Sequence, residues 1–263
     1  MLKKNISFVS HIGSGYRNWD RYGVSVNDES LLAIIADGVG GQIMGGIAAG
    51  MVVDKFNLLH KEGKLSSEDI PFLFDELSVE MRKVCMEMAT TVILIFIIKR
   101  GEKLELYYTW AGDSRFFLLT ERNLKLLNGV EVFQKRRKKL CILTDDDTFP
   151  WKYYRNGDIS LDKVTRCEGK NRLLFSLPRN GERMRDRIVK IDVEYGDKIL
   201  LCTDGFWELF REQSEIMEWM TNDINDFESE FIRFLDSHVE KGVRVDNATG
   251  IRIDLENGIL KGK

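Results

Sequence analysis

The chain has 263 residues, of which 43% are hydrophobic and 31% charged, with a formal net charge of −3 at pH 7. This length can bury a large core, and the mixed-sign charge gives no indication of a nucleic-acid partner. The longest apolar run, VILIFII at 92–98, has the length of a strand, so we expect no membrane partner. MLKKNISFVSHIG lacks the long apolar segment of a signal peptide.

The first predicted elements surround a glycine-rich turn. LLAIIA (31–36) predicts a buried strand, and IMGGIAAGMVVDKFNLLH (43–60) predicts a helix whose small residues let it approach a sheet closely. Serines in KLSSED (64–69) can cap a second helix, predicted at roughly 68–88, where apolar residues recur at helical spacing.

Strands dominate the next part of the chain. TTVILIFIIKR (90–100), LELYYTWA (104–111) and RFFLLT (115–120) predict an antiparallel meander joined by the short turns GEK and GDS. The least regular stretch, 130–185, is basic and aromatic, and we expect loops and a small subdomain or flap there.

The C-terminal part alternates strands and helices. RIVKIDV (187–193) and KILLCT (198–203) predict strands, helical segments follow from 206 to about 240, and GIRIDL (250–255) predicts a closing strand. The whole order is typical of an α+β protein with antiparallel sheets. Because no linker or repeat divides the chain, we expect a single domain over 1–263.

Cysteine and histidine usage argues against the common zinc sites. The chain has three histidines far apart in sequence and four cysteines without a CxxC pair: Cys85, Cys141, Cys167 and Cys202. Each cysteine lies in or near an apolar segment, which indicates buried free thiols and a cytoplasmic location.

Aspartates recur where predicted strands end. Three of them follow strands or lie in the turn after one, and two precede strands: Asp37, Asp204, Asp113, Asp246 and Asp20. An Asp-Gly pair is also an ordinary turn, and Asp also caps helices, so any one of these residues alone is better explained that way. Several such acids without a His or Cys ligand set favour a site for hard divalent cations.

The glycine loop does not fit the common phosphate-binding fingerprints. A dinucleotide motif G-x-G-x-x-G would start at Gly38 and Gly40, but its last position falls on Ile43. A P-loop would use Gly40 and Gly45, but Gly46 stands where its lysine is required. The single acid of this loop therefore needs another explanation.

Short motifs distributed along 10–255 resemble the ordered motifs of the metal-dependent serine/threonine protein phosphatases, the PPM or type 2C family. They are ADGVGG (36–41), ATT (89–91), WAGDSRFFLL (110–119), LLCTDGFWELF (200–210) and VDNAT (245–249). The resemblance implies a four-layer α-β-β-α sandwich with two central antiparallel sheets and a two-metal centre at one edge. It also implies hydrolysis of phosphoserine and phosphothreonine in phosphoproteins by a metal-activated water.

The resemblance assigns roles residue by residue. Asp37 would bridge two Mn²⁺ or Mg²⁺ ions, and the Gly38 carbonyl would bind one of them. Asp204 and Asp246 would complete the shell of the first ion, and Asp113 would help to hold a third, weaker ion. Asp20 would orient metal-bound water, so that Asp37, Asp20 and Asp204 form the catalytic set.

The N-terminal motif GYRNWDR (15–21) departs from the family pattern. Asn18 and Asp20 match, but Trp19 replaces a glutamate, and Gly15 stands where the phosphate-binding arginine would be. Arg17 or Arg21 could take the role of that arginine, because a planar guanidinium donates paired hydrogen bonds to phosphate. The departure leaves an alternative, a weak or inactive phosphatase-like module that binds a phosphorylated partner.

Two charged segments complete the sequence predictions. We expect the acids of LTDDDT (143–148) to be mainly solvated. QKRRKK (134–139) predicts a solvated strand or loop, with docking of an acidic or phosphorylated partner as the sharper option. The expected partner is a phosphorylated protein substrate, and without a heptad seam we expect a monomer.

Overall fold

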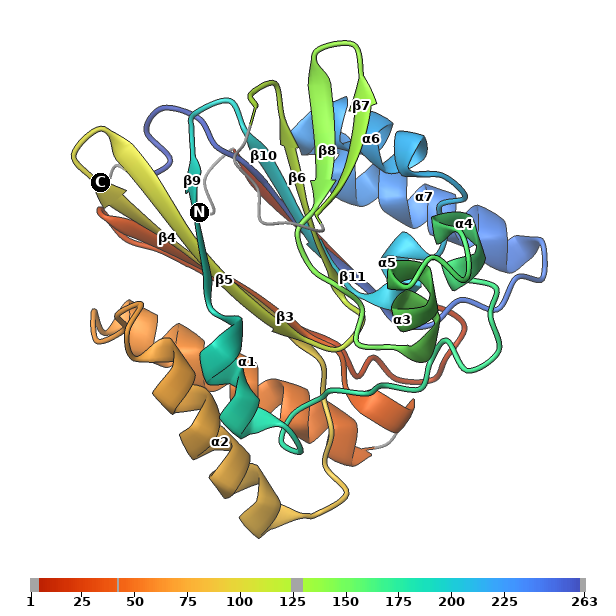
Figure 1. Ribbon diagram of the computed structural model, residues 1–263, viewed down its shortest axis with the longest axis horizontal. Coiled ribbons are helices and arrows are strands. Elements are labelled where there is room, and N and C mark those ends of the chain that lie inside the picture. The colour runs from red at the N-terminus through yellow and green to blue at the C-terminus, as the bar shows by residue number, and fades with distance from the viewer. Residues whose placement is uncertain (1–4, 42, 124–129, 261–263) are drawn as a thin grey trace.

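The computed structural model describes residues 5–41, 43–123 and 130–260. Two antiparallel sheets lie face to face at its centre (Figure 1). The six-stranded sheet has the order β1 (Ile6–His11), β11 (Ala248–Asp254), β10 (Lys198–Cys202), β6 (Arg115–Thr120), β8 (Lys138–Ile142) and β7 (Glu131–Lys135). The five-stranded sheet has the order β2 (Arg21–Val26), β3 (Ser30–Ala36), β4 (Val92–Arg100), β5 (Lys103–Ala111) and β9 (Val189–Val193).

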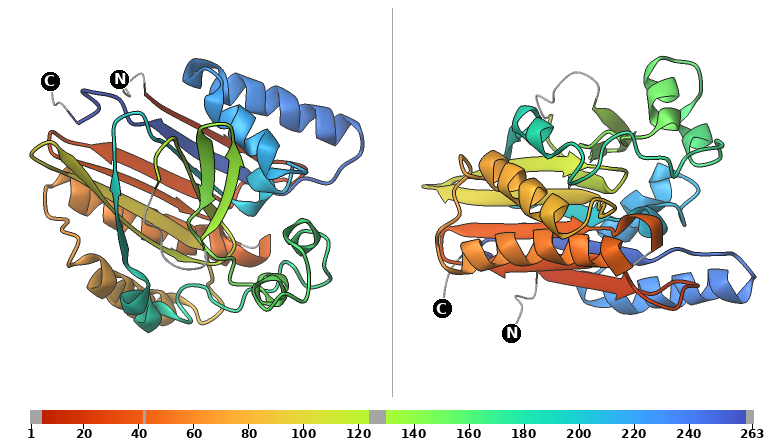
Figure 2. Two further views of the ribbon diagram at one scale, coloured as in Figure 1. Left: turned by 45° about the horizontal axis from the view of Figure 1, so that its top comes forward. Right: turned by 90° about the horizontal axis from the view of Figure 1, so that it is seen from below.

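Helices cover the outer face of each sheet, as the two views in Figure 2 show. Buried side chains of α1 (Ile43–Lys61) and α2 (Ile70–Val84) pack on the five-stranded sheet, and those of α6 (Gln213–Thr221) and α7 (Phe227–Glu240) pack on the six-stranded sheet. The predicted α-β-β-α sandwich is therefore confirmed. The shorter helices are η1 (Val39–Gly41), α3 (Phe149–Arg155), α4 (Leu161–Val164), η2 (Gly181–Arg187), α5 (Asp204–Trp207) and η3 (Ile224–Asp226).

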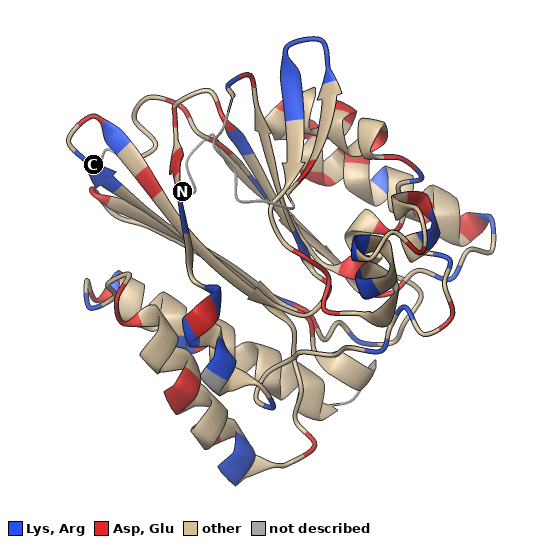
Figure 3. Cartoon of the chain, viewed as in Figure 1, with Lys and Arg blue, Asp and Glu red and all other residues tan. Residues whose placement is uncertain are grey.

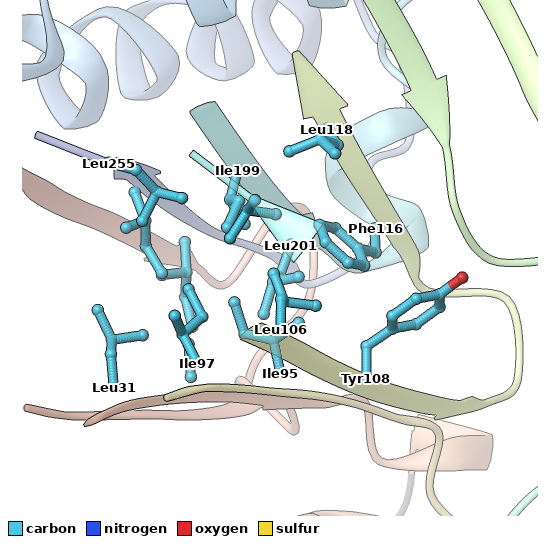
Figure 4. Packing of buried hydrophobic residues seen from close by; sticks show 14 of the residues in the cluster. Leu31, Ile95, Ile97, Leu106, Tyr108, Phe116, Leu118, Ile199, Leu201 and Leu255 are labelled. Carbon is cyan, nitrogen blue, oxygen red and sulfur yellow. The ribbon is translucent and has the colours of Figure 1, made fainter. Parts of the chain in front are cut away.

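The main core fills the space between the sheets. Leu31, Ile95 and Ile97 of the five-stranded sheet point towards Ile199 and Leu201 of the six-stranded sheet (Figure 4). The opposite faces of β3 and β4 are buried under α1 and α2. Burial on both faces explains why LLAIIA and VILIFII are continuous apolar runs instead of alternating ones.

The predicted three-stranded meander is wrong in its last strand. β4 pairs with β5, but β6 belongs to the other sheet, so the GDS turn carries the chain from one sheet to the other. Gly112 in this turn has a φ of 104°, a conformation that favours glycine, and a Cβ there would lie 2.5 Å from Thr91 Cγ2. The crossing places Asp113 at the edge where the sheets meet.

Other sequence predictions need smaller corrections. The stretch 130–185 contains the β7–β8 hairpin, α3 and α4, joined by loops. Strand β1 was not predicted from the sequence. Cys141 and Cys202 are buried as predicted, but Cys85 and Cys167 are only half-buried. Within the described residues, no helix has the length and apolar character needed to cross a membrane.

Candidate metal centre

The end of β3 carries Asp37, and the segment before β4 fixes its backbone. The Asp37 carbonyl accepts hydrogen bonds from Thr91 N and Thr90 Oγ1, both at 2.8 Å. The Asp37 N–H donates to Thr91 Oγ1 at 3.0 Å. A carboxylate on a backbone that is held in this way keeps a fixed position, as a binding site requires.

The pairing of β2 with β3 brings Asp20 beside Asp37. Arg21 lies opposite Ala36, so the residues just beyond this pair are Asp20 and Asp37. Asp20 Oδ2 accepts a hydrogen bond from Thr203 Oγ1 at 3.0 Å, whereas Asp20 Oδ1 is buried without a hydrogen-bond partner among the described residues. An unpartnered buried carboxylate oxygen is costly, which indicates that a ligand belongs beside it.

The six-stranded sheet brings three further aspartates to the same edge. Asp204 begins α5 directly after β10, while Asp113 precedes β6 and Asp246 precedes β11, the two neighbours of β10. One oxygen of Asp204 accepts the Gly205 N–H at 2.6 Å, and one oxygen of Asp246 accepts the Asn247 N–H at 2.8 Å. These bonds orient each carboxylate and leave its second oxygen available.

Burial and mutual electrostatic repulsion raise the pKa values of four of these carboxylates. Burial raises the pKa of Asp20 and of Asp113 to about 7. Burial also raises the pKa of Asp37 and of Asp204 well above the usual range, and the neighbouring carboxylates raise both further. A cation at this edge would offset both the burial and the repulsion.

The donor set fits a hard divalent cation. Every candidate side-chain ligand is a carboxylate, and oxygen ligands are what Mg²⁺ and Mn²⁺ prefer. Within the described part of the chain, no three Asp, Glu, His or Cys side chains converge so that they alone could hold one ion. Mg²⁺ usually keeps several waters and uses one or two carboxylates, so pairs of these aspartates suit ions whose other ligands are water.

Glycines let the Asp37 loop press against the start of α1. A Cβ on Gly38 would lie 2.5 Å from the Gly45 carbonyl carbon, and a Cβ on Gly45 would lie 2.6 Å from the Val39 carbonyl oxygen. Gly46 lies equally close to the Trp19 ring, whose Cε3 would be 2.5 Å from an added Cβ. Gly50 was also expected to serve close packing, but a Cβ there would meet nothing within 4 Å.

The predicted phosphate-binding arginines are Arg17, in the loop before β2, and Arg21, the first residue of β2. Asn247 holds this loop: its side chain accepts the Trp19 N–H at 2.7 Å and donates to the carbonyls of Ile12 and Arg17 at 2.8 and 3.0 Å. The Arg17 side chain is exposed, and its guanidinium lies 5.8 Å from the centroid of the Trp19 ring. Arg21 instead donates to the backbone carbonyls of Asn18 and Asp20 in the preceding loop, so Arg17 is the freer of the two arginines.

Residues 9–241 match the family model described as Protein phosphatase 2C. The chain belongs to the protein phosphatase 2C family. Among curated relatives, the serine/threonine phosphatase stp of Listeria welshimeri is 27% identical over 210 residues, which are 75% of each chain. The resemblance drawn from the short motifs is therefore confirmed.

Solved structures share the fold of this phosphatase 2C chain. A bacterial serine phosphatase has a TM-score of 0.73 at 18% identity, covering 97% of this chain and 98% of the other. The catalytic domain of the serine threonine protein phosphatase PstP, in complex with two manganese ions, has a TM-score of 0.60 at 21% identity, covering 96% and 98% of the two chains.

Two acids of this phosphatase 2C chain that were expected to be solvated are buried in ion pairs. Asp146 accepts hydrogen bonds from Arg115 Nε and Nη2 at 2.9 and 2.7 Å. The Arg115 guanidinium lies 3.4 Å from the centroid of the Trp207 ring, and Trp207 Nε1 donates to the Asp113 carbonyl at 3.0 Å. The burial of Asp146 thus supports the backbone of a predicted metal ligand.

Asp147 is the second of these acids, and it holds the GDS turn at Gly112, the residue before Asp113. Its carboxylate accepts the Gly112 N–H at 2.9 Å and both terminal nitrogens of Arg187 at 2.7 Å. The Arg187 guanidinium also lies 4.0 Å from the centroid of the Phe175 ring. The hydrogen bonds of Asp147 to Gly112 and Arg187 join residues more than 30 positions apart, so no local sequence pattern predicts them.

Proposed function

We propose that this protein is a serine/threonine phosphatase that hydrolyses phosphoserine and phosphothreonine in phosphoproteins with Mn²⁺ or Mg²⁺. The observation that carries the proposal is the meeting of Asp20, Asp37, Asp113, Asp204 and Asp246 at one edge of a phosphatase 2C fold. No structural observation favours an inactive phosphopeptide-binding module, because each of these aspartates is retained. We take residues 1–263 as one catalytic domain.

Each carboxylate has a proposed role. Asp37 would bridge two ions, with the Gly38 carbonyl as a further ligand, and Asp204 and Asp246 would bind the first ion. Asp113 would help to hold a third, weaker ion. When bound, such ions make water a better nucleophile at neutral pH and neutralise charge on the phosphoryl oxygens.

The chain's own groups position the other reactants. Asp20 Oδ1 has no hydrogen-bond partner among the described residues, so it can accept a hydrogen bond or a proton from the attacking water. The Thr203 hydroxyl holds the other oxygen of this carboxylate and thereby fixes its direction. We propose Arg17, and secondarily Arg21, as the donors to the substrate phosphate.

Hydrolysis of p-nitrophenyl phosphate and of a phosphothreonine peptide tests the proposal. With Mn²⁺ we expect turnover that a chelator abolishes, and we expect Asp37→Asn and Asp204→Asn each to lower kcat by at least about a thousandfold. Asp28→Asn is the matched control, since Asp28 is an exposed turn residue outside this edge. Wild-type turnover that persists in chelator, or full activity of both site variants, would refute the proposed centre.

A further inference from the structure

The β7–β8 hairpin ends in a concentrated positive charge. Residues 135–139 are KRRKK in a chain whose net charge is −3, and Figure 3 shows this charge at the projecting tip. Lys135 pairs with Glu218 of α6 at 2.9 Å, and Lys139 donates to Asn123. In the described part of the chain, no ion pair involves Arg136, Arg137 or Lys138.

The turn that presents this charge is not built from the residues that favour such a turn. Lys135 pairs with Lys138, so Arg136 and Arg137 form a two-residue loop. Arg136 has a φ of 58° and is the only non-glycine residue of the described ranges with positive φ. Tight hairpins place glycine or asparagine at such positions, and an arginine there costs conformational energy. An arginine at such a costly position therefore indicates a use for its charge.

The strand beside this turn is an open edge. β7 is the last strand of the six-stranded sheet, and no described strand pairs with its outer side. In a two-residue hairpin the pair Lys135–Lys138 is hydrogen-bonded, so pairs along β7 alternate and Val132 and Gln134 direct their backbone groups outward. The side chains of Val132 and Phe133 are 47% and 38% exposed, which gives this edge apolar contacts as well.

A hollow of about 610 Å³ lies between the tip and α6, and four basic residues outnumber the two acidic ones in its lining: Lys135, Arg136, Arg137, Lys138, Met217, Thr221, Glu121 and Glu218. This surface is remote from the aspartates. β6 begins just after Asp113, and its far end, Thr120, pairs with Lys139. Five strand steps at 3.4 Å place the two ends of β6 roughly 17 Å apart. Ligand binding at the tip would therefore leave the aspartates unobstructed.

We propose that the β7 edge and the basic tip together dock an extended acidic segment of a partner protein. The segment would pair its backbone with Val132 and Gln134, and its carboxylates would face Arg136, Arg137 and Lys138. Strand addition uses alternating N–H and C=O groups, which a polypeptide offers but a nucleic acid or a lipid headgroup does not. Positive charge at the end of the edge selects acidic sequences and fixes their register.

Fluorescence anisotropy with a labelled (Glu-Val)₅ peptide tests this proposal, with (Gln-Val)₅ as the neutral probe. The key variant is Arg136→Gly/Arg137→Ser, because glycine suits the positive φ and the hairpin should fold at least as well. The matched control is Arg100→Gln/Lys103→Gln, which removes the same charge beside the β4–β5 turn. We expect the tip variant to bind the acidic peptide at least about fivefold more weakly at low salt, and the control to bind like wild type.

Two further readouts bear on the same proposal. Peptide binding should slow hydrogen exchange at the Val132 and Gln134 amides, and hydrolysis of p-nitrophenyl phosphate should be equal in wild type and the tip variant. Equal peptide affinity in wild type and the tip variant would overturn the proposal. An equal loss of peptide affinity in the Arg100→Gln/Lys103→Gln control would also overturn it, as would unchanged hydrogen exchange at the Val132 and Gln134 amides. Tighter binding of a phosphatidylserine vesicle, or of a ten-nucleotide single strand, than of the peptide would overturn it as well.

Discussion

The Thr203 hydroxyl donates to Asp20 Oδ2 at 3.0 Å and accepts the Thr249 N–H at the same distance. Asp20 precedes a strand of the five-stranded sheet, whereas Thr203 follows a strand of the six-stranded sheet. This single hydroxyl therefore ties the two halves of the sandwich together at the edge where the aspartates lie.

Replacing Thr203 by valine removes this link while keeping the side-chain shape. Two buried groups lose a partner, so we expect the unfolding free energy to fall by about 1–3 kcal/mol. We expect kcat to fall by about tenfold, because Asp20 loses its orientation. Thr203→Ser keeps the hydroxyl and should stay near wild type in urea melts and in turnover, whereas a Thr203→Val variant with the stability and turnover of wild type would show that the hydrogen bond does not matter.

The repulsion among the aspartates predicts that Asp37→Asn stabilises the metal-free protein and weakens its stabilisation by metal. In metal-free protein the variant removes one buried charge from a like-charged cluster, so its melting temperature should rise. In wild type, Mn²⁺ at a hundred times its Kd should raise the free energy of unfolding by about 2.7 kcal/mol, and the variant should lose most of that increase. Thermal melts with Mn²⁺ and with chelator check both signs, and a metal-free variant that melts below wild type would contradict the repulsion.

His60 gives the protein a second pH dependence, away from the aspartates. Its ring is buried between Ser25 Oγ, 2.7 Å from Nδ1, and Ser30 Oγ, 2.9 Å from Nε2, and burial lowers the pKa of His60 to about 4. The unfolded chain, with a pKa near 6.5, binds more protons between these values, so stability is lost as pH falls from about 6.5 to 4.

Between pH 6.5 and pH 4 the His60 ring lowers the free energy of unfolding by about 3 kcal/mol, and above pH 6.5 its contribution to stability is constant. His60→Gln removes the titrating group, so the difference between its unfolding free energy and that of wild type isolates this effect from the aspartates. Urea melts from pH 4 to pH 8 check it. A difference that does not change with pH would show that His60 is protonated equally in the folded and unfolded states.

Asn247 is predicted to act on substrate binding through the N-terminal loop. Asn247→Asp replaces the amide donor to the Ile12 and Arg17 carbonyls by an acceptor, so the loop that carries Arg17 should loosen. We expect KM for a phosphothreonine peptide to rise about tenfold, with a smaller change in kcat. Asn225→Asp, in the exposed short helix η3, is the control. An unchanged KM in Asn247→Asp would show that this loop does not contribute to phosphate binding.

The sequence predicted those features whose cause is local. β3 and β4 are recognisable because burial on both faces demands continuous apolar residues, and the aspartates stand out because each lies next to an end of a predicted strand. The sheet to which β6 belongs was mispredicted, because a GDS turn is compatible with either a hairpin or a crossing. Thr203, Asn247 and Asp147 act through partners far along the chain, so their roles became visible only when the strands were assembled.

The contact between Gly46 and Trp19 predicts how the altered N-terminal motif is held. An added Cβ at Gly46 would lie 2.5 Å from the Trp19 ring, so Gly46→Ala must displace that ring and the loop beside Asp20. We expect a red-shifted tryptophan emission, a lower melting temperature and a higher KM for the phosphopeptide. In a Trp19→Phe background the same substitution should cause no red shift, which assigns the signal to Trp19.

Gly50 supplies the matched control one turn further along α1, because a Cβ there would meet nothing within 4 Å. Alanine at this position should raise the unfolding free energy by about 0.5–1 kcal/mol through helix propensity alone. Its emission and KM should match wild type. If Gly46→Ala behaved like Gly50→Ala in all three measurements, the Trp19 ring would not be held against α1, and the motif would need another anchor.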